Sequence, residues 1–262
     1  MFLAFALSAF RVRSAYRAQV WAMLFGGSLD VLARISIWTA VFGGAATVDG
    51  VTLPQMVTYA VIGAAFLSAW DTTELVREVG ADIRSGDVIG QLLKPYDYPL
   101  ALFAKQVGSR VFDSLVVGLP VLVVMALIFG LQAPASFGHG VLFVFYCLVS
   151  IGMIMGIGLL FGLLSFWVLD AHSLEWFMRG MVSVLAGGFV PLWFFPAGFA
   201  EVAAALPFSW ITFHPMATYL GQVDLPTSAM LLVAGAAWLT GLFGLIAWLW
   251  SRTTLRLTVQ GG

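Results

Sequence analysis

Two residue pairs have types and spacings that catalysis or metal binding would need. His172 lies three residues before Glu175, and Ser209 lies five residues before His214. A zinc site would need a third ligand beside the first pair, and a hydrolytic triad would need an orienting acid beside the second. Neither is present. Helix capping and local pairing explain His172 and Glu175 better, and Ser209 and His214 lie in a Pro-broken segment. The sequence therefore predicts no metal site, no bound cofactor and no catalytic residue.

A chain that hydrolyses ATP by itself would carry a glycine-rich loop that ends in Gly-Lys-Ser or Gly-Lys-Thr. No Gly-Lys dipeptide occurs in the sequence. The chain is therefore not predicted to be an enzyme, and any ATP that drives it would be bound by a separate chain.

Asp30 and Arg34 form the one charged pair deep in an apolar stretch. They are four residues apart with the acid first, which is the favourable order for an ion pair on one helical face. Each alone would cost about 2.5–3.5 kcal/mol at the centre of a membrane helix, so pairing or a wet cavity is expected. Two interpretations remain: a structural lock between helices, which is favoured, and a polar spot on a transport path or subunit seam.

The elements that carry these residues are very apolar. Hydrophobic residues make up 61% of the sequence and charged residues 10%, against roughly 45–50% and about 25% in a soluble domain. Surrounding membrane lipid is therefore expected. The net charge of −1 gives no indication of a nucleic-acid partner, and the single Cys147 excludes an internal disulfide.

We expect an all-α integral membrane fold in which residues 1–262 form one transmembrane domain. Lys and Arg concentrate before the first span, between the second and third, and after the last, so both termini are predicted to be cytoplasmic. The six predicted transmembrane helices cover about 21–43, 55–74, 108–131, 141–169, 176–195 and 228–251.

Two segments outside the spans are predicted to lie at the membrane surfaces. In residues 1–20 the arginines follow the apolar stretch, which argues against a cleaved signal peptide and favours an interfacial helix. Residues 190–227 are apolar but interrupted by five prolines, which favours short re-entrant helices in the outer leaflet over an ordinary external loop.

The most polar stretch, residues 75–100, predicts a cytoplasmic docking helix. In "IRSGDVIGQLLKPYDYPL", Gly86 ends one helix, Asp87 caps a short new one, and Pro95 ends that. Apolar residues within a charged rim are suited to a partner's groove, although an amphipathic helix that rests on lipid is the alternative. The predicted contact residues are Arg84, Asp87, Val88, Leu92, Leu93 and Lys94.

Four glycines at 152, 156, 158 and 162 give two overlapping registers of small residues spaced four apart. Such registers permit close approach of helix backbones. The sequence therefore predicts a packing face here, within the chain or between subunits.

The stretch quoted above, together with "VPLWFFP" and "LPFSWITFHPMATYLG", resembles the permease subunits of type II ABC exporters, in particular the viologen-exporter-like branch. The resemblance implies a six-helix half-transporter of the bacterial cytoplasmic (inner) membrane. It implies pairing with a second, identical or similar permease and with two copies of a cytoplasmic ABC ATPase. It also implies that residues about 82–95 are the coupling helix, with Asp87, Leu92 and Lys94 at the ATPase.

On this interpretation the chain forms the translocation path for an amphipathic or hydrophobic substrate and is coupled to a separate ATPase. An ATPase-independent secondary transporter or channel is the main alternative. It is disfavoured because Asp30 and Arg34 are the only deep charges in the predicted spans. A membrane scaffold that recruits a soluble protein is the third possibility.

Overall fold

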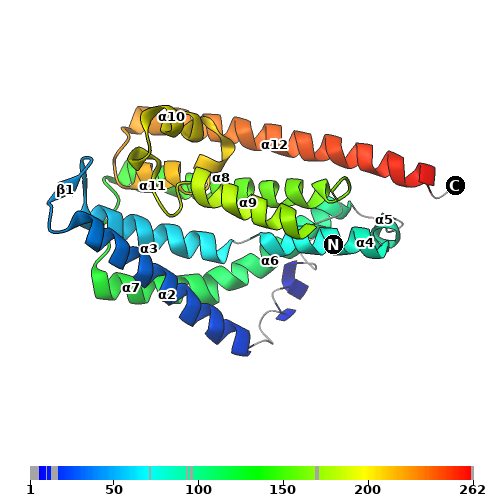
Figure 1. The fold of residues 1–262 in the computed structure, drawn as a ribbon, viewed down its shortest axis with the longest axis horizontal. Helices are drawn as coiled ribbons and strands as arrows, with labels where there is room; N and C mark the ends of the chain where they lie inside the picture. Colours follow the sequence, from blue (N-terminus) through cyan, green and yellow to red (C-terminus); the bar gives the residue numbers. More distant parts are fainter. Residues whose placement is uncertain are drawn as a thin grey trace.

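Long helices form most of the chain (Figure 1). The computed structural model describes residues 6–9, 11–12, 17–70, 72–92, 94, 97–168 and 171–260. Within this part of the chain, four helices are long and apolar enough to cross a membrane, which confirms an all-α membrane protein at this level. They are Ala18–Phe42, Tyr98–Phe129, Phe137–Leu164 and Leu225–Thr253.

Helix α2 (Arg17–Phe42) leads into a hairpin that the sequence analysis did not predict. Strands β1 (Thr47–Val48) and β2 (Val51–Thr52) pair antiparallel across Asp49 and Gly50, whose φ angles are 49° and 77°. Positive φ at both central residues is the signature of the tight turn that Asp-Gly favours. Of the predicted interfacial helix, residues 6–9 and 11–12 are helical, residues 17–20 belong to α2, and the rest lies outside the described residues.

Helix α3 (Leu53–Ala69) begins at a capping box. The amide of Thr52 donates to Gln55 Oε1 at 2.9 Å, and the amide of Gln55 donates back to Thr52 Oγ1 at 3.4 Å. After the helix ends, the chain resumes as α4 (Thr73–Ser85) and turns at Gly86, with φ 79°, into the short α5 (Asp87–Leu92). The α3–α4 line is thus broken near residue 70, and only the apolar part of α3 resembles a membrane span.

The third long helix begins ten residues before the predicted start at 108. It consists of α6 (Tyr98–Asp113), the π-helical turn η1 (Ser114–Gly118) and α7 (Leu119–Phe129). Asp97 caps it by accepting a hydrogen bond from the amide of Leu100 at 2.9 Å. Pro99 in the first turn has no backbone N–H, so no donor is left unpaired at that position. Residues 98–107, which were predicted to lie in a loop between the second and third spans, therefore lie inside a helix.

Helix α8 (Phe137–Leu164) is followed by α9 (Ala171–Leu185), which is shorter than the predicted span 176–195. The chain leaves the helix at Ala186, and Gly187 with φ 65° turns it away. The predicted Pro-broken segment contains η2 (Leu192–Phe194), α10 (Ala197–Ala205), η3 (Pro207–Trp210) and α11 (Phe213–Tyr219).

The last helix, α12 (Leu225–Gln260), extends to the end of the bundle where α4 and α5 lie (Figure 1). Asp224 caps it by accepting from the amide of Thr227 at 3.3 Å. Hydrogen bonds from the Thr227 side chain and amide hold the pKa of Asp224 below its usual value.

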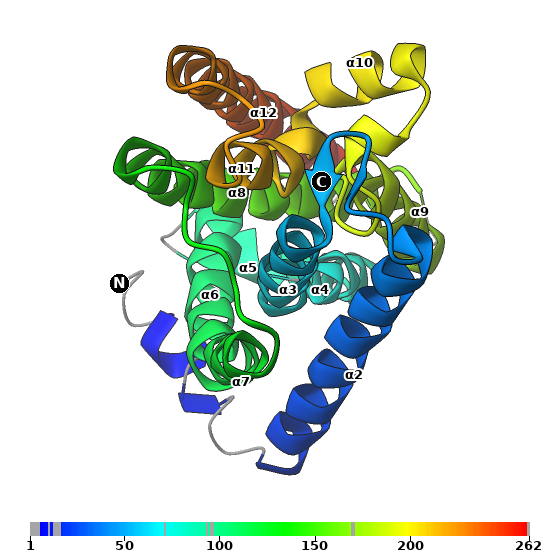
Figure 2. The same cartoon turned by 90° about the vertical axis from the view of Figure 1, so that its left-hand side faces the viewer.

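Figure 2 shows α8 at the centre, with α11 and α12 on one side and α3, α4 and α6 on the other. The four glycines of its two predicted registers divide between two neighbours. A Cβ at Gly152 or Gly156 would meet Leu239 or Leu242 of α12, whereas one at Gly158 or Gly162 would meet Thr72 or Val79. Both registers are packing faces within this chain, and α8 packs against α4, α6, α9, α11 and α12.

Gly158 is expected to tolerate substitution poorly. A Cβ there would lie 2.6 Å from Thr72 Cβ. Because the backbone fixes the position of Thr72 Cβ, rotating the Thr72 side chain would not relieve this clash. Gly158→Ala should lower the free energy of unfolding by about 1–3 kcal/mol, measured by titrating the detergent-solubilised protein with sodium dodecyl sulfate. Gly180→Ala on α9, where no described atom lies within 4 Å, is the control and should be neutral or stabilising by up to about 1 kcal/mol. Equal stability of the two variants would contradict the packing argument.

Candidate functional site

The corner between α4 and α5 projects from the long helices. Helix α4 is amphipathic and buries Leu75, Val76 and Val79 against the core. Its polar face is fixed to α6 by the Tyr98 hydroxyl, which donates to Asp82 Oδ2 at 2.7 Å. The Tyr98 ring stacks on Trp250 of α12 with centroids 5.4 Å apart. The base of α5 is thus anchored to two of the long helices.

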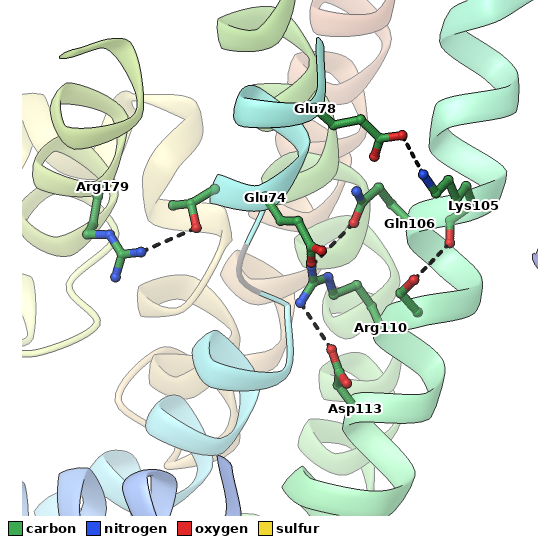
Figure 3. Close-up of polar contacts among 9 residues, drawn as sticks. Glu74, Glu78, Lys105, Gln106, Arg110, Asp113 and Arg179 are labelled. Atoms are coloured by element: carbon green, nitrogen blue, oxygen red, sulfur yellow. Dashed lines mark hydrogen bonds and ion pairs between the residues drawn. The ribbon is translucent and has the colours of Figure 1, made fainter. Parts of the chain in front are cut away.

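Charged residues form a second connection between α4 and α6, drawn in Figure 3. Arg110 is 3% exposed and bonds to Asp113, which is 1% exposed, with Nη1 3.1 Å from Oδ2. Its Nη2 donates to Glu74 Oε2 at 2.9 Å and to Gln106 Oε1 at 3.3 Å. Beside this group Lys105 forms an ion pair with Glu78. We call Glu74, Gln106, Arg110 and Asp113 the α4–α6 polar cluster.

On its other side α4 is joined to α9. Arg77 Nε lies 2.9 Å from Glu175 Oε2, and Glu175 is almost fully buried. Arg179 Nη2 donates to the Thr73 hydroxyl at 3.2 Å (Figure 3). Because α4 has directional contacts to both α6 and α9, a displacement at α5 cannot stay local.

Asp30 and Arg34 form the ion pair that their spacing predicts, with Arg34 Nε 2.9 Å from Asp30 Oδ2. Arg34 Nη1 also donates to the carbonyl of Gly188 at 2.6 Å, and the guanidinium lies 4.9 Å from the Phe189 ring centroid. The Tyr59 hydroxyl donates to the carbonyl of Gly187 at 2.6 Å. Arg34 and Tyr59 therefore attach the turn after α9 to α2 and α3.

A cleft of about 400 Å³ lies between these contacts. Its walls come from α2, α3, α4, α8, α9 and the turn after α9. The polar lining residues are Asp30, Arg34, Thr72, Thr73, Arg179 and Ser183. We call this space the α2–α9 cleft. Among the described residues no group of three or more His, Cys, Asp or Glu side chains is placed to hold a metal ion.

A family described as ABC-2 family transporter protein matches residues 29–261. The match begins inside α2, ends after α12, and so includes the cleft, the α4–α5 corner and the polar cluster. The chain belongs to the ABC-2 family of transporter proteins. No curated protein and no solved structure gives a significant match. Family membership makes the chain a multi-pass membrane component of a transporter, of a kind that generally works with an ATPase partner.

The predicted docking residues of this ABC-2 protein do not all face outwards. Arg84 is exposed, with Nε 3.2 Å from the carbonyl of Gly80, and Asp87 accepts from the Ser85 hydroxyl at 2.7 Å. Lys94 is also exposed. Val88 is only 2% exposed and packs with the core, so its predicted place on an outer contact surface is wrong. Leu92 ends α5, but its side chain, like all of Leu93, lies outside what the structure describes.

Sequence reasoning missed the α4–α6 polar cluster and the Glu175 contacts. Arg110 and Asp113 are three residues apart, a spacing that signals a pair on one helical face. That signal was available within the predicted span 108–131 but was not used. The contacts that Glu74 and Glu175 make with other helices leave no signal in the local pattern, because they depend on how α4 packs.

Proposed function

We propose that this ABC-2 protein is the membrane-spanning subunit of an ATP-driven exporter that moves its substrate by alternating access. In this proposal α2, α3, α6–α7, α8, α9 and α12 provide six spans, and residues 190–227 form a re-entrant cap on the outer side. The Lys and Arg distribution supports a cytoplasmic position for both termini and for α5. The resemblance to type II ABC exporters supports the inner membrane of a bacterial cell. A second permease subunit completes the path.

The arrangement of α4 is the observation that carries the coupling part of this proposal. A cytoplasmic ATPase would bind at α5 and move it during ATP binding and hydrolysis. The Arg110–Glu74 contact at 2.9 Å and the Arg77–Glu175 contact at 2.9 Å join α4 to α6 and α9. Movement of α5 would therefore displace two helices and, through α9, a wall of the α2–α9 cleft.

Native mass spectrometry of the protein, gently extracted from its host's membranes, tests this function. The expected complex contains two permease subunits and two soluble ATPase subunits, and it should hydrolyse ATP after reconstitution. A lone permease or a simple oligomer that stays free of ATPase in several mild detergents would overturn the proposal.

The α4–α6 polar cluster favours one second candidate, an ATPase-independent secondary transporter. Asp113 is a buried carboxylic acid paired with the buried Arg110, and both lie in a helix long enough to span the membrane. Buried carboxylates at such depth serve as proton relays in some transporters. Vesicles that contain the permease alone separate the two candidates, because only a secondary transporter would accumulate substrate under an imposed pH gradient without ATP.

A further inference from the structure

The α2–α9 cleft places charged groups deep in the membrane-spanning part of the protein. Arg34 lies eight residues before the end of α2, or about 12 Å along its axis at 1.5 Å per residue. Charged side chains at such depth face partners or a wet cavity, because burial in lipid is costly. The volume of about 400 Å³ falls within the range of small-molecule sites.

The charges in and beside the cleft do not cancel. Asp30 pairs with Arg34, and Glu175 lies near both Arg77 and Arg179. These five side chains carry three positive and two negative charges, which leaves one excess positive charge. A single anionic group on a bound molecule would balance it.

Arg34 is oriented to bind such a group. Its Nε donates to Asp30 and its Nη1 to the carbonyl of Gly188, while Phe189 packs against the guanidinium. These contacts fix the planar guanidinium. Its Nη2 donates no hydrogen bond to a described residue, and the side chain lines the cleft. The N–H groups of Nη2 on a fixed guanidinium suit a carboxylate, phosphate or sulfate, which accepts charge-assisted hydrogen bonds.

The remaining wall of the cleft is apolar. Leu67, Ile154, Met178, Val182 and Phe189 contribute it from α3, α8, α9 and the following turn. An alkyl or aromatic body can therefore lie along this wall while its polar end meets Arg34. A cationic head group is disfavoured, because Asp30 is already paired and both Arg34 and Arg179 line the same space.

We propose that the α2–α9 cleft binds amphipathic anions, with the acidic group at Arg34 and the apolar body against α8 and α9. The assignment rests on the proposed transport function, because it names the substrate class of that path. Asp30 acts here as a positioning residue that holds the Arg34 guanidinium in place.

The test compares two dansyl probes of equal alkyl length, dansylamino-undecanoate and its trimethylammonium counterpart, on the permease–ATPase complex in phosphatidylcholine nanodiscs. Binding is followed by energy transfer from tryptophan to the dansyl group. The anionic probe should bind at least about tenfold more tightly than the cationic one. Ser183→Glu should weaken the anionic probe about tenfold relative to Ser183→Gln, which has nearly the same shape without the charge.

Arg34→Gln should weaken the anionic probe by about 10–100-fold, the loss expected for a charge-assisted contact. Arg252→Gln is the matched control, because Arg252 also lies over an aromatic ring, 5.5 Å from that of Trp248, but on α12 and outside the cleft. Preference for the cationic probe, equal binding to the Ser183→Glu and Ser183→Gln variants, or no binding of the anionic probe would each overturn the assignment. Intact ATP hydrolysis by the same complex would then leave the proposed transport function standing.

Discussion

Arg110→Leu is expected to lower the free energy of unfolding by about 3–5 kcal/mol, because it leaves the carboxylate of Asp113 buried without its cation. Asp113 is 1% exposed, so water cannot replace the lost contact. Glu74 is 56% exposed and can be solvated when Arg110 is removed. The cost should therefore come almost entirely from Asp113. Titration of the detergent-solubilised protein with sodium dodecyl sulfate measures it.

The double variant Arg110→Leu with Asp113→Leu provides the control. Replacing both members of a buried ion pair by apolar residues is often neutral or stabilising, whereas removing one is not. The double variant should therefore recover most of the stability lost in Arg110→Leu. If it were no more stable than the single variant, the loss would reflect packing of the arginine side chain rather than an unpaired charge. Glu74→Gln should change stability by less than about 1 kcal/mol.

Gly90→Trp is expected to abolish co-purification of the ATPase while leaving insertion and stability unchanged. Gly90 is exposed on α5, and no described atom lies within 4 Å of a Cβ placed there. A side chain can therefore leave α5 at this position without meeting a described atom at its Cβ, and tryptophan is a better helix former than glycine. At the centre of the proposed docking surface, however, the indole would clash with the ATPase and hold it away from α5.

Gly244→Trp on α12 is the matched control, since this glycine is also helical, exposed and free of described atoms within 4 Å. Its complex with the ATPase should survive pull-down through a tag on the permease. Normal co-purification of the Gly90→Trp variant would show that the ATPase does not dock on α5. That result would leave the α4–α5 corner without its proposed role.

Local sequence patterns predicted those features that depend on a single segment of the chain. The Asp30–Arg34 contact follows from a four-residue spacing on one helix, and the two glycine registers of α8 follow from small residues at the same spacing. The early end of α9 was also predictable, because Gly187, Gly188 and Pro191 are strong helix terminators. Because residues 186–195 are apolar, the predicted fifth span was nevertheless continued to residue 195.

Contacts between helices could not be predicted in this way. Val88 faces inwards because the corner at Gly86 folds α5 back against the core, and the sequence of a six-residue helix does not determine which side packs. Arg110 reaches Glu74 across 36 positions of sequence, and Tyr59 reaches Gly187 across 128. Such pairs are determined by the packing of whole helices, for which one sequence carries no periodic signal.

The π-helical turn at Ser114–Gly118 corrects the register of the long helix. Residues four apart on an α-helix drift by about 40° around the axis, but a π-turn winds less per residue and removes part of that drift. The buried stripe consequently stays on one line, from Gln106, Arg110 and Asp113 in α6 through Val117 to Val121 and Met125 in α7.

The contacts made by this buried stripe change from polar to apolar at the π-helical turn. Towards α4 the stripe makes hydrogen bonds and ion pairs, which fix relative position because they are directional. Towards α2 and α3, Val121 and Met125 pack with Val31, Val57 and Val61 in apolar contacts. Apolar contacts are not directional, so this end of the helix is held by close packing rather than by hydrogen bonds or ion pairs. If α5 moves as proposed, the end of the helix near α5 would follow α4 through its directional contacts, whereas the other end would stay packed against α2 and α3.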